Sequence, residues 1–330
     1  MAPLTDSIPK PALPFLDKPI ITYLLEQFRE AGITRLVLAL GHGADEIIQL
    51  FNANGNFGFD VHVCLEREPL GTGGALRNCL QYIEGRSSVQ VANGDILNNI
   101  NLQAMFEWHR RAGNVLTIAA FSVPDPSRYG LIIMDEEHRI KDFLEKPHGS
   151  DASQHWVNTG YYIIDPALVA EIPEGKKVSL ERETFPALIR AGRAIGGFPH
   201  SGYWRDIGTL ASFWRAHFEV LHHYQMYDPA FGGYENKGFH VFRGYVYIAE
   251  TAVLAGKAKL NGQVVVSRGV KIGENAQLER TIVMPHAEIG EGAELLDCII
   301  GPEAKIRPGE KLEGACITQS RKVPFDTGEY

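Results

Sequence analysis

Two aspartates of the 330-residue chain lie where a sheet protein can bind a ligand through a metal ion. Asp95 follows an apolar, strand-like run, 89–92, and open α/β sheets bind ligands at the carboxyl ends of their strands. Asp206 lies in a second segment, 202–208, flanked by glycines and followed by a helix-like stripe. Two carboxylates from distant segments suit Mg²⁺, which prefers oxygen ligands and keeps substrate phosphates in its shell. Asp95 alone could equally be a helix cap, so the pair carries the prediction.

Three further segments offer groups for phosphates or for a closely approaching ligand. Lys10 projects from a proline-rich loop, and Lys146 lies in a Glu-Lys-Pro run; an ammonium group is a point charge suited to phosphate. The glycine-rich segment 68–74 stands between a strand and a helix, where glycines let a backbone approach a ligand and the helix N-terminus favours polar or anionic groups. Each segment alone is compatible with an ordinary loop. Their order along the chain carries the prediction.

The elements that must position these groups change character near residue 230. Before it, strand-like and helix-like segments alternate, which is typical of an α/β sheet with crossover helices. We predict a hairpin over 129–143 that turns at 135–138. The apolar spacing predicts helices over 18–32, 45–51, 74–82, 102–111 and 210–221, and strands over 36–40, 61–65, 89–92, 115–123 and 156–164.

After residue 240 the helical pattern gives way to a repeat. Aliphatic residues recur every six positions at Ile248, Leu254, Leu260, Val266, Ile272 and Leu278. A second, longer recurrence relates the equally spaced Ile272, Ile289 and Ile306. A period near six with inward aliphatic residues indicates a parallel β-helix with three short faces per coil; a β-sandwich with fortuitous spacing is the alternative. We therefore predict a domain over 1–226, a linker over 227–240 and a β-helix over 241–330, which we expect to mediate self-association rather than catalysis.

Composition narrows the class of protein. Lys and Arg number 32 and Asp and Glu number 40, so the net charge of −8 argues against a nucleic-acid-binding protein. The four cysteines form no CxxC pair, which indicates neither a zinc site nor a disulfide framework. No signal peptide is visible, and no apolar run reaches the roughly 20 residues that span a bilayer. We predict a cytoplasmic protein with no membrane partner.

Taken in order, these segments resemble the sugar-phosphate nucleotidyltransferase family and, within it, the mannose-1-phosphate guanylyltransferases. The resemblance covers essentially the whole chain. It implies a Rossmann-like α/β domain, with a mixed, mostly parallel sheet and helices on both faces, followed by a left-handed parallel β-helix of hexapeptide-type repeats. The motifs that carry it are Pro-Leu-Thr and Pro-Lys-Pro-x-x-Pro (3–14), Glu-Pro-Leu-Gly-Thr-x-Gly (68–74), Asn-Gly-Asp (93–95), Glu-Lys-Pro (145–147), Asn-Thr-Gly (158–160) and Trp-Arg-Asp-Ile-Gly-Thr (204–209).

The resemblance implies attack of a sugar-1-phosphate oxygen on the α-phosphorus of a nucleoside triphosphate, with GTP and mannose-1-phosphate as the favoured pair. Asp95 and Asp206 would hold Mg²⁺, Lys146 would bind the sugar phosphate, and Lys10 would face the phosphates of the nucleotide. A uridylyl-, thymidylyl- or adenylyltransferase of the same family is an alternative. An acyltransferase active in the β-helix is a third possibility, but no histidine lies in a recognisable catalytic loop there.

The resemblance also implies a set of substrate-binding residues. Among them, Glu145, Asn158 and Gly130 would contact sugar hydroxyls, while the glycine-rich segment would form part of the base pocket. The full set is Gly71, Thr72, Gly94, Gly130, Glu145, Asn158 and Thr159.

The sequence departs from the family pattern at its start. Family members carry a strand and a Gly-rich loop ending in Gly-Thr-Arg just before the segment that matches residues 2–5, where this sequence begins with Met1. That piece would supply backbone N–H groups, an arginine and an interior strand. We expect a misassigned start site, with the first domain truncated at its N-terminus. The competing expectation is a catalytically silent, regulatory or nucleotide-sugar-binding homologue.

Overall fold

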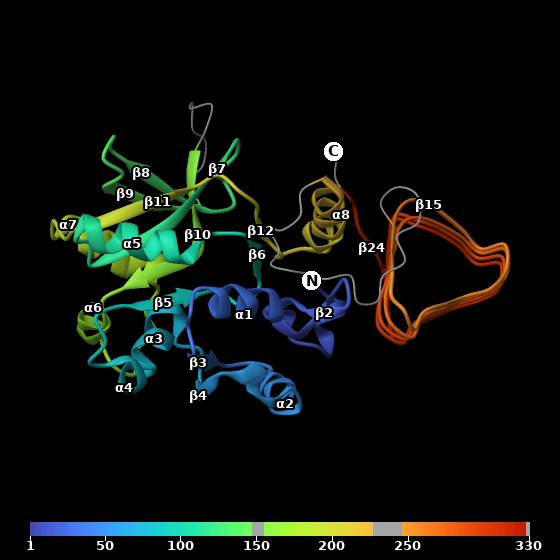
Figure 1. The fold of residues 1–330 in the computed structure, drawn as a ribbon, viewed down its shortest axis with the longest axis horizontal. Coiled ribbons are helices and arrows are strands. Elements are labelled where there is room, and N and C mark those ends of the chain that lie inside the picture. Colours follow the sequence, from blue (N-terminus) through green and yellow to red (C-terminus); the bar gives the residue numbers. More distant parts are fainter. Residues whose placement is uncertain (147–154, 227–245, 328–330) are drawn as a thin grey trace. The chain divides into compact units, whose positions relative to one another are not determined.

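The computed structural model describes residues 1–146, 155–226 and 246–327, with only the backbone described for 223–226. These residues form two compact units (Figure 1). The sheet unit spans Leu25–Trp204, and the coil unit combines Met1–Leu24 with Arg205–Tyr330. The predicted linker, 227–240, lies outside the described residues, so the predicted domain boundaries stay a prediction. None of the described helices combines the length and the apolar character that a membrane span needs.

The sheet unit contains a six-stranded mixed sheet in which β10 is central. β10 pairs antiparallel with β5, β7 and β8, while β11 runs parallel to β7. Antiparallel pairs therefore outnumber parallel ones, and the expectation of a mostly parallel sheet is wrong; β10 runs against its three neighbours, and a tight hairpin joins β8 to β9. The strands are β5 (Val89–Ala92), β7 (Leu116–Val123), β8 (Gly130–Met134), β9 (Ile140–Glu145), β10 (His155–Ile164) and β11 (Ile195–His200).

A second sheet of the same unit consists of β3 (Arg35–Leu40) and β4 (Asp60–Leu65), which pair in parallel. Within the described residues β3 has no second strand partner, and β5 pairs only with β10. Two further short strands are β6 (Ile96–Asn98) and β12 (Trp204–Asp206).

Helices cover both faces of the six-stranded sheet. Leu116 and Ile118 of β7 pack into a core that also contains residues of α4, α6 and α7. Thr117, between them in sequence, faces α5 and lies 2.8 Å from His109 Nδ1. The helices are α1 (Ile20–Glu30), α2 (Ala44–Ala53), α3 (Gly71–Asn78), α4 (Leu80–Ile83), α5 (Leu102–Ala112), α6 (Pro166–Glu171) and α7 (Phe185–Arg190), with a π-helical turn, η4, over Leu180–Thr184.

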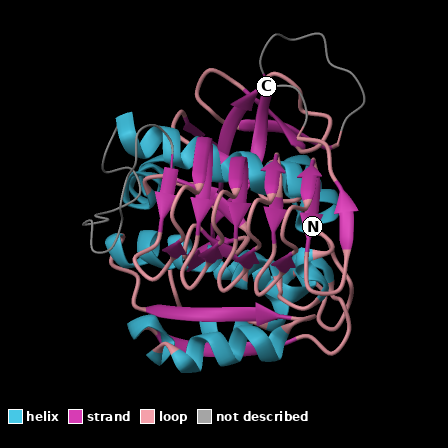
Figure 2. Ribbon diagram, turned by 90° about the vertical axis from the view of Figure 1, so that its right-hand side faces the viewer, coloured by secondary structure: helices cyan, strands magenta, loops and turns pink. Residues whose placement is uncertain are grey.

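The coil unit is built from short strands that stack in parallel along successive coils (Figures 1 and 2). Each strand pairs with its counterpart on the next coil; Ile272, for example, pairs with Ile289. This β-rich region fits a parallel β-helix. Its strands are β13 (Val246–Ile248), β14 (Val253–Leu254), β15 (Lys259–Val266), β16 (Lys271–Ile272), β17 (Gln277–Val283), β18 (Glu288–Ile289), β19 (Glu294–Leu296), β20 (Ile299–Ile300), β21 (Lys305–Ile306), β22 (Lys311–Glu313) and β23 (Ala315–Ile317), and β24 (Lys322–Pro324) pairs antiparallel with β23.

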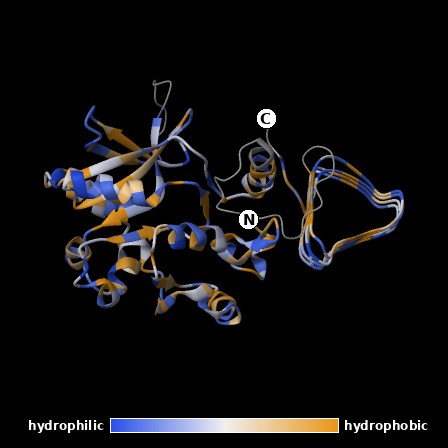
Figure 3. Cartoon of the chain, viewed as in Figure 1, coloured by the Kyte–Doolittle hydropathy of each residue, from blue (hydrophilic) through white to orange (hydrophobic). Residues whose placement is uncertain are grey.

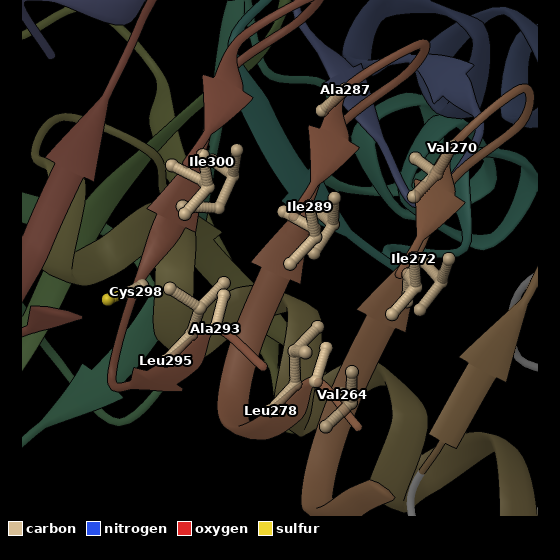
Figure 4. Packing of buried hydrophobic residues seen from close by; sticks show 14 of the residues in the cluster. Val264, Val270, Ile272, Leu278, Ala287, Ile289, Ala293, Leu295, Cys298 and Ile300 are labelled. Carbon is tan, nitrogen blue, oxygen red and sulfur yellow. The ribbon is translucent and has the colours of Figure 1, made fainter. Parts of the chain in front are cut away.

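The interior of the coils follows the predicted period of six. All six aliphatic residues of that series belong to the core of the coils or pack against it. Figure 4 shows Ile272 and Ile289, and likewise Leu278 and Leu295, pointing into the same interior from neighbouring coils. In Figure 3 apolar and polar residues recur at matching places of successive coils.

The corners of the coils have left-handed backbone conformations at fixed places. One corner series has positive φ at Asn275, Gly292 and Gly309, which lie at equal spacing along the sequence, one on each coil. Glycines are required for a second reason at Gly273 and Gly290. A Cβ on Gly290 would lie 2.4 Å from the backbone nitrogen of Pro308, on the next coil. The repeated small residues therefore let consecutive backbones approach closely.

The start of the chain and α8 (Leu210–Met226) pack against each other in the coil unit. Phe15 is fully buried and contacts the rings of Tyr23, Phe213 and His217. Burial lowers the pKa of His217 to about 3, so the ring stays neutral near pH 7 and accepts a hydrogen bond from the amide of Leu16 over 3.1 Å. This part of the unit includes η1 (Leu4–Asp6), η2 (Lys10–Ala12), β1 (Pro14–Phe15) and β2 (Lys18–Pro19).

Candidate functional site

The glycine-rich segment forms the start of α3, and its glycines press against another part of the chain. A Cβ on Gly71, whose φ is +72°, would lie 2.6 Å from the carbonyl oxygen of Val178, and a Cβ on Gly74 would lie 2.5 Å from that of Lys176. The amide of Gly73 donates to the Val178 carbonyl over 2.9 Å. The close approach that these glycines permit is therefore to residues 176–178 of the same unit, and this contact fixes the segment that follows.

The segment that follows delivers a carboxylate to Thr72. The hydroxyl of Thr72 donates to Glu181 Oε2 over 2.6 Å and accepts from the amide of Leu180 over 2.9 Å. The hydroxyl of Ser179 donates to the same Glu181 oxygen over 2.8 Å. Glu181 thus joins α3 to the π-helical turn η4, although 109 residues separate it from Thr72.

The other oxygen of Glu181 connects to the central strand. The hydroxyl of Tyr162 donates to Glu181 Oε1 over 3.4 Å and accepts from Asn158 Nδ2 over 2.9 Å. Asn158 and Tyr162 both lie on β10. The side chains connected in this way, together with the neighbouring Glu145, are called the polar cluster below: Thr72, Glu145, Asn158, Tyr162, Ser179 and Glu181.

Glu145 stands at the end of β9, opposite Gly130 of β8. A Cβ on Gly130 would lie 3.0 Å from Glu145 Oε2 and 2.5 Å from the ring of Phe143, so glycine leaves room for this carboxylate. Burial raises the pKa of Glu145, and the charge of Glu181 raises it further, while Lys146 acts in the opposite direction. The cluster therefore holds two carboxylates close enough to repel each other, and hydroxyl donors of a ligand would stabilise such a pair.

Lys146 is exposed and directly follows Glu145. Its φ is +51°, in the left-handed region that residues other than glycine seldom adopt. Its amide donates to the carbonyl of Tyr129 over 3.0 Å. Backbone strain of this kind concentrates at functional sites, where the surrounding structure maintains it. Pro147, the last residue of the Glu-Lys-Pro run, lies outside the described residues.

Asp95 lies in the turn after β5, as the sequence predicts, and this turn contacts a bulge of β10. The amide of Asn93 donates to the carbonyl of Gly160 over 3.0 Å. Gly160 has φ +77°, and a Cβ there would lie 2.6 Å from Asn93 Nδ2, so only glycine fits. The charge of Asp95 adds to the effect of burial in raising the pKa of Tyr161, which places the carboxylate near β10. Gly94 is partly buried in the same turn.

Thr159 has a structural contact of its own. It is fully buried, and its hydroxyl donates to the carbonyl of Ala119 over 2.8 Å. The Thr159 carbonyl accepts from Trp204 Nε1 over 3.0 Å. The hydroxyl of Thr159 therefore forms its hydrogen bond within the sheet and stabilises the bulge of β10 next to Asn158.

Lys10 and Asp206 belong to the coil unit, so they are described apart from the polar cluster. Lys10 is half-buried at the first residue of η2. Asp206 is half-buried at the end of β12, and its carboxylate folds over Gly208, where a Cβ would lie 3.4 Å from Oδ2. The preceding Arg205 forms an ion pair with Glu219 of α8.

The carboxylates fit a magnesium ion whose coordination shell is completed by a substrate and water. In the described ranges, no group of three or more His, Cys, Asp or Glu side chains could hold a metal ion. Asp95 offers hard carboxylate oxygens in the turn after β5. Mg²⁺ in nucleotide enzymes uses one or two carboxylates and takes the remaining ligands from phosphates and water.

Sequence reasoning missed Ser179 and Glu181, and it assigned no role to Tyr162. The sequence analysis predicts no element over residues 165–200, yet these residues form α6, η4, α7 and β11. Tyr162 had an available signal, because it lies two and four positions after Gly160 and Asn158 on a predicted strand, where alternate residues share a face. Glu181 had none, since its partner Thr72 is far away in sequence.

Comparison with known proteins defines the class. The nucleotidyl transferase family model matches residues 1–223, and the GMPPB C-terminal domain model matches residues 242–323. The chain therefore belongs to the nucleotidyl transferase family, and it is similar to mannose-1-phosphate guanylyltransferases. The sequence-based identification of the family is confirmed.

The individual relatives belong to the same family, but their named activities use different nucleotide bases. The mannose-1-phosphate guanylyltransferase of Mycobacterium tuberculosis is 32% identical over 284 residues, which are 86% of this chain and 76% of that protein. A UTP–glucose-1-phosphate uridylyltransferase of Synechocystis is 30% identical over 226 residues, 65% of this chain and 58% of that protein. Several other curated relatives are likewise covered over less than two thirds of their length.

A solved structure shares the fold. HddC from Yersinia pseudotuberculosis, complexed with GMP-PN, superposes with a TM-score of 0.58 at 28% identity. The match covers 67% of this chain and 93% of that chain. The mixed α/β architecture of the sheet unit is therefore that of a Rossmann-like nucleotidyltransferase domain.

Proposed function

We propose that the protein transfers a nucleotidyl group from a nucleoside triphosphate to a sugar-1-phosphate, giving a nucleoside diphosphate sugar and pyrophosphate. The observation that carries this proposal is the polar cluster beside Lys146. It combines two carboxylates, two hydroxyl groups, an amide and a phenol, which suit the hydroxyls of a sugar, next to an ammonium group that suits a phosphate. Membership of the nucleotidyl transferase family supports the same reaction.

The residue roles that we propose are those that the resemblance to the family implies. Lys146 binds the phosphate group of the sugar phosphate. Glu145, Asn158 and Gly130 contact the hydroxyl groups of the sugar. Lys10 faces the phosphates of the nucleotide. We propose that Gly71 and Thr72 form part of the pocket for the nucleotide base, and that Gly94 and Thr159 also belong to the substrate-binding residues.

We propose that Asp95 and Asp206 hold Mg²⁺, which when bound neutralises charge on the triphosphate. In the reaction a phosphate oxygen of the sugar-1-phosphate forms a bond to the α-phosphorus, and the bond from that phosphorus to the bridging oxygen of pyrophosphate breaks. Both reactants are anions, so the contribution of the chain is mainly orientation and charge neutralisation by Lys146 and Lys10.

We favour GTP and mannose-1-phosphate as the substrates. The named activities of several relatives support this pair, and the match to the GMPPB C-terminal domain supports it independently. A uridylyltransferase acting on glucose-1-phosphate is the second candidate, because a relative with that name matches nearly as well in identity.

We further propose that the coils form a left-handed β-helix of the hexapeptide type and that the protein self-associates through them. The period of six and the stacked parallel strands support the first point. Light scattering on the whole chain tests self-association. A deletion of the coils is unsuitable for this test, because α8 and the start of the chain would lose the residues against which they pack.

A cytoplasmic location stays a prediction, supported by four free, buried cysteines.

One experiment tests the activity and its metal together. Four nucleoside triphosphates are assayed against mannose-1-phosphate and glucose-1-phosphate by pyrophosphate release, with Mg²⁺ and with EDTA. We expect turnover with GTP and mannose-1-phosphate that EDTA abolishes. Asp95→Asn and Asp206→Asn should each lower kcat at least ~100-fold with the fold retained. Asp142→Asn, an exposed carboxylate of β9, is the matched control.

Two outcomes would contradict the proposal. Near-normal turnover in both aspartate variants would refute the metal assignment. Binding of nucleotide without turnover in any substrate combination would favour the regulatory or nucleotide-sugar-binding homologue.

A further inference from the structure

The turn between β1 and β2 is attached to the coils by polar groups of two residues. The carbonyl of Leu16 accepts from Ser267 Oγ over 2.9 Å. Asp17 Oδ1 accepts from the amide of Arg268 over 2.9 Å, and Oδ2 accepts from the hydroxyl of Tyr247 over 3.0 Å. The Arg268 guanidinium also donates to the Asp17 carbonyl over 3.1 Å. The turn is therefore held by two different coils, one at residue 247 and one at residues 267–268.

Burial makes these bonds hard to replace with water. Ser267 is 1% exposed and Tyr247 is 7% exposed. Burial raises the pKa of Asp17, whereas the hydrogen bonds from Arg268 and Tyr247 lower it. Burial together with the charge of Asp17 raises the pKa of Tyr247, so the phenol keeps its proton and remains a donor. Removing one donor would leave one oxygen of this partly desolvated carboxylate without its hydrogen bond.

The same segment has a second attachment nearer the start of the chain. Leu4 is 2% exposed and packs at Gly301, where a Cβ would lie 3.3 Å from Leu4 Cδ2. The Asp6 carboxylate lies 2.7 Å from the Arg321 guanidinium. Lys10 lies between the two attachments, so the coils hold the segment that carries it on both sides.

We propose that the coils position the segment that carries Lys10, between the attachments at Asp6 and Asp17, and that Asp17 is the positioning residue through which they do so. This inference rests on the proposed role of Lys10 toward the triphosphate. It gives the C-terminal coils a part in substrate binding in addition to any part in assembly. Because the contact is local to the turn, its loss should weaken nucleotide binding and leave sugar-phosphate binding unchanged.

The test uses two small changes in the full chain. Tyr247→Phe removes one hydroxyl, and Asp17→Asn removes the charge that Arg268 and Tyr247 compensate. Glu288→Gln is the matched control, since this carboxylate on the outer face of the coils pairs with Lys271 and Lys305 and not with the start of the chain. The first readout is hydrogen exchange of the amides in residues 10–19, which does not depend on any activity.

We expect amide exchange in residues 10–19 to rise about tenfold in both variants, the equivalent of about 1.4 kcal/mol, with exchange in β17 and in the control unchanged. We expect the KM for the nucleoside triphosphate to rise by a similar factor while the KM for the sugar phosphate stays within twofold. Unchanged exchange would overturn the attachment. Raised exchange with an unchanged nucleotide KM would overturn the positioning role. Absence of turnover in the unaltered chain would refute the proposed function instead, and equilibrium binding of GTP then replaces KM as the deciding readout.

Discussion

The start of α3 and the corners of the coils use glycine in the same way and to different ends. In both places a missing side chain lets one backbone lie directly on another, as Gly74 does on Lys176 and Gly290 on Pro308. In the coils this contact recurs from one coil to the next, at Gly273 and Gly290, around an interior that is almost entirely aliphatic. In the described part of the sheet unit it occurs at the start of α3, and it delivers Glu181 to a group of polar side chains. Regular repetition provides stability, and the irregular contact builds a site.

The largest effect that we expect comes from filling the repeated contact. Gly290→Ala should lower the free energy of unfolding by about 3 kcal/mol, because its Cβ would overlap the backbone of the next coil, which cannot rotate away as a side chain can. Urea denaturation measures the change. Gly292→Ala is the control: Gly292 has positive φ but no atom within 4 Å of a Cβ, and it should cost only about 1 kcal/mol. Equal losses in the two variants would show that the contact of Gly290 with the next coil costs no more than the positive φ of Gly292.

A smaller effect, on catalysis, should come from the contact at the start of α3 in the sheet unit. Glu181→Gln should lower kcat/KM for the sugar phosphate about tenfold, because an amide replaces the carboxylate that Thr72 and Ser179 hold. Steady-state kinetics with varied sugar phosphate measures this. Glu183→Gln is the matched control, because this neighbouring carboxylate accepts from the amide of Ser179 and does not contact Thr72. Equal losses in the two variants would mean that kcat/KM depends on the π-helical turn η4 as a whole and not on the carboxylate of Glu181.

Glu181→Gln should also change the pH dependence of kcat/KM. The pKa of Glu145 is raised above 4.5 by burial and by the charge of Glu181. Folding therefore favours protonated Glu145, and the stability from this group is complete below pH 4.5 and is lost as the pH rises through the raised pKa. Glu181→Gln removes one cause of the shift, so the acid limb of kcat/KM should move to lower pH. A limb that stays in place would show either that Glu145 does not set this limb or that the charge of Glu181 does not act on Glu145.

Sequence patterns predicted the repeated region better than the irregular one. The period of six at residues such as Ile272 and Leu278 identified the interior of the coils because each coil repeats one geometry. The predicted positions of Asp95 and Lys146, after β5 and β9, follow from local strand and motif signals. Glu181 could not be found in this way, because its place depends on how 176–178 dock on the α3 glycines. The direction of β10 was also missed, since periodicity identifies a strand and not its orientation.

The smallest effect concerns a carboxylate that belongs to the coils alone. Asp297 forms a two-pronged ion pair with Arg280 of the preceding coil, with both nitrogen–oxygen distances at 2.7 Å. Its side chain is 16% exposed and that of Arg280 is 35% exposed, so water screens the pair in part. Asp297→Asn should therefore cost about 1 kcal/mol of unfolding free energy by urea denaturation. Glu279→Gln, which removes the single, more exposed contact to the same guanidinium, should cost less. Neither variant should change kcat or either KM, in contrast to Asp17→Asn, because these carboxylates join coil to coil and do not reach the turn at residues 16–17. A changed nucleotide KM in Asp297→Asn would mean that the coils transmit strain along their length rather than acting through one local attachment.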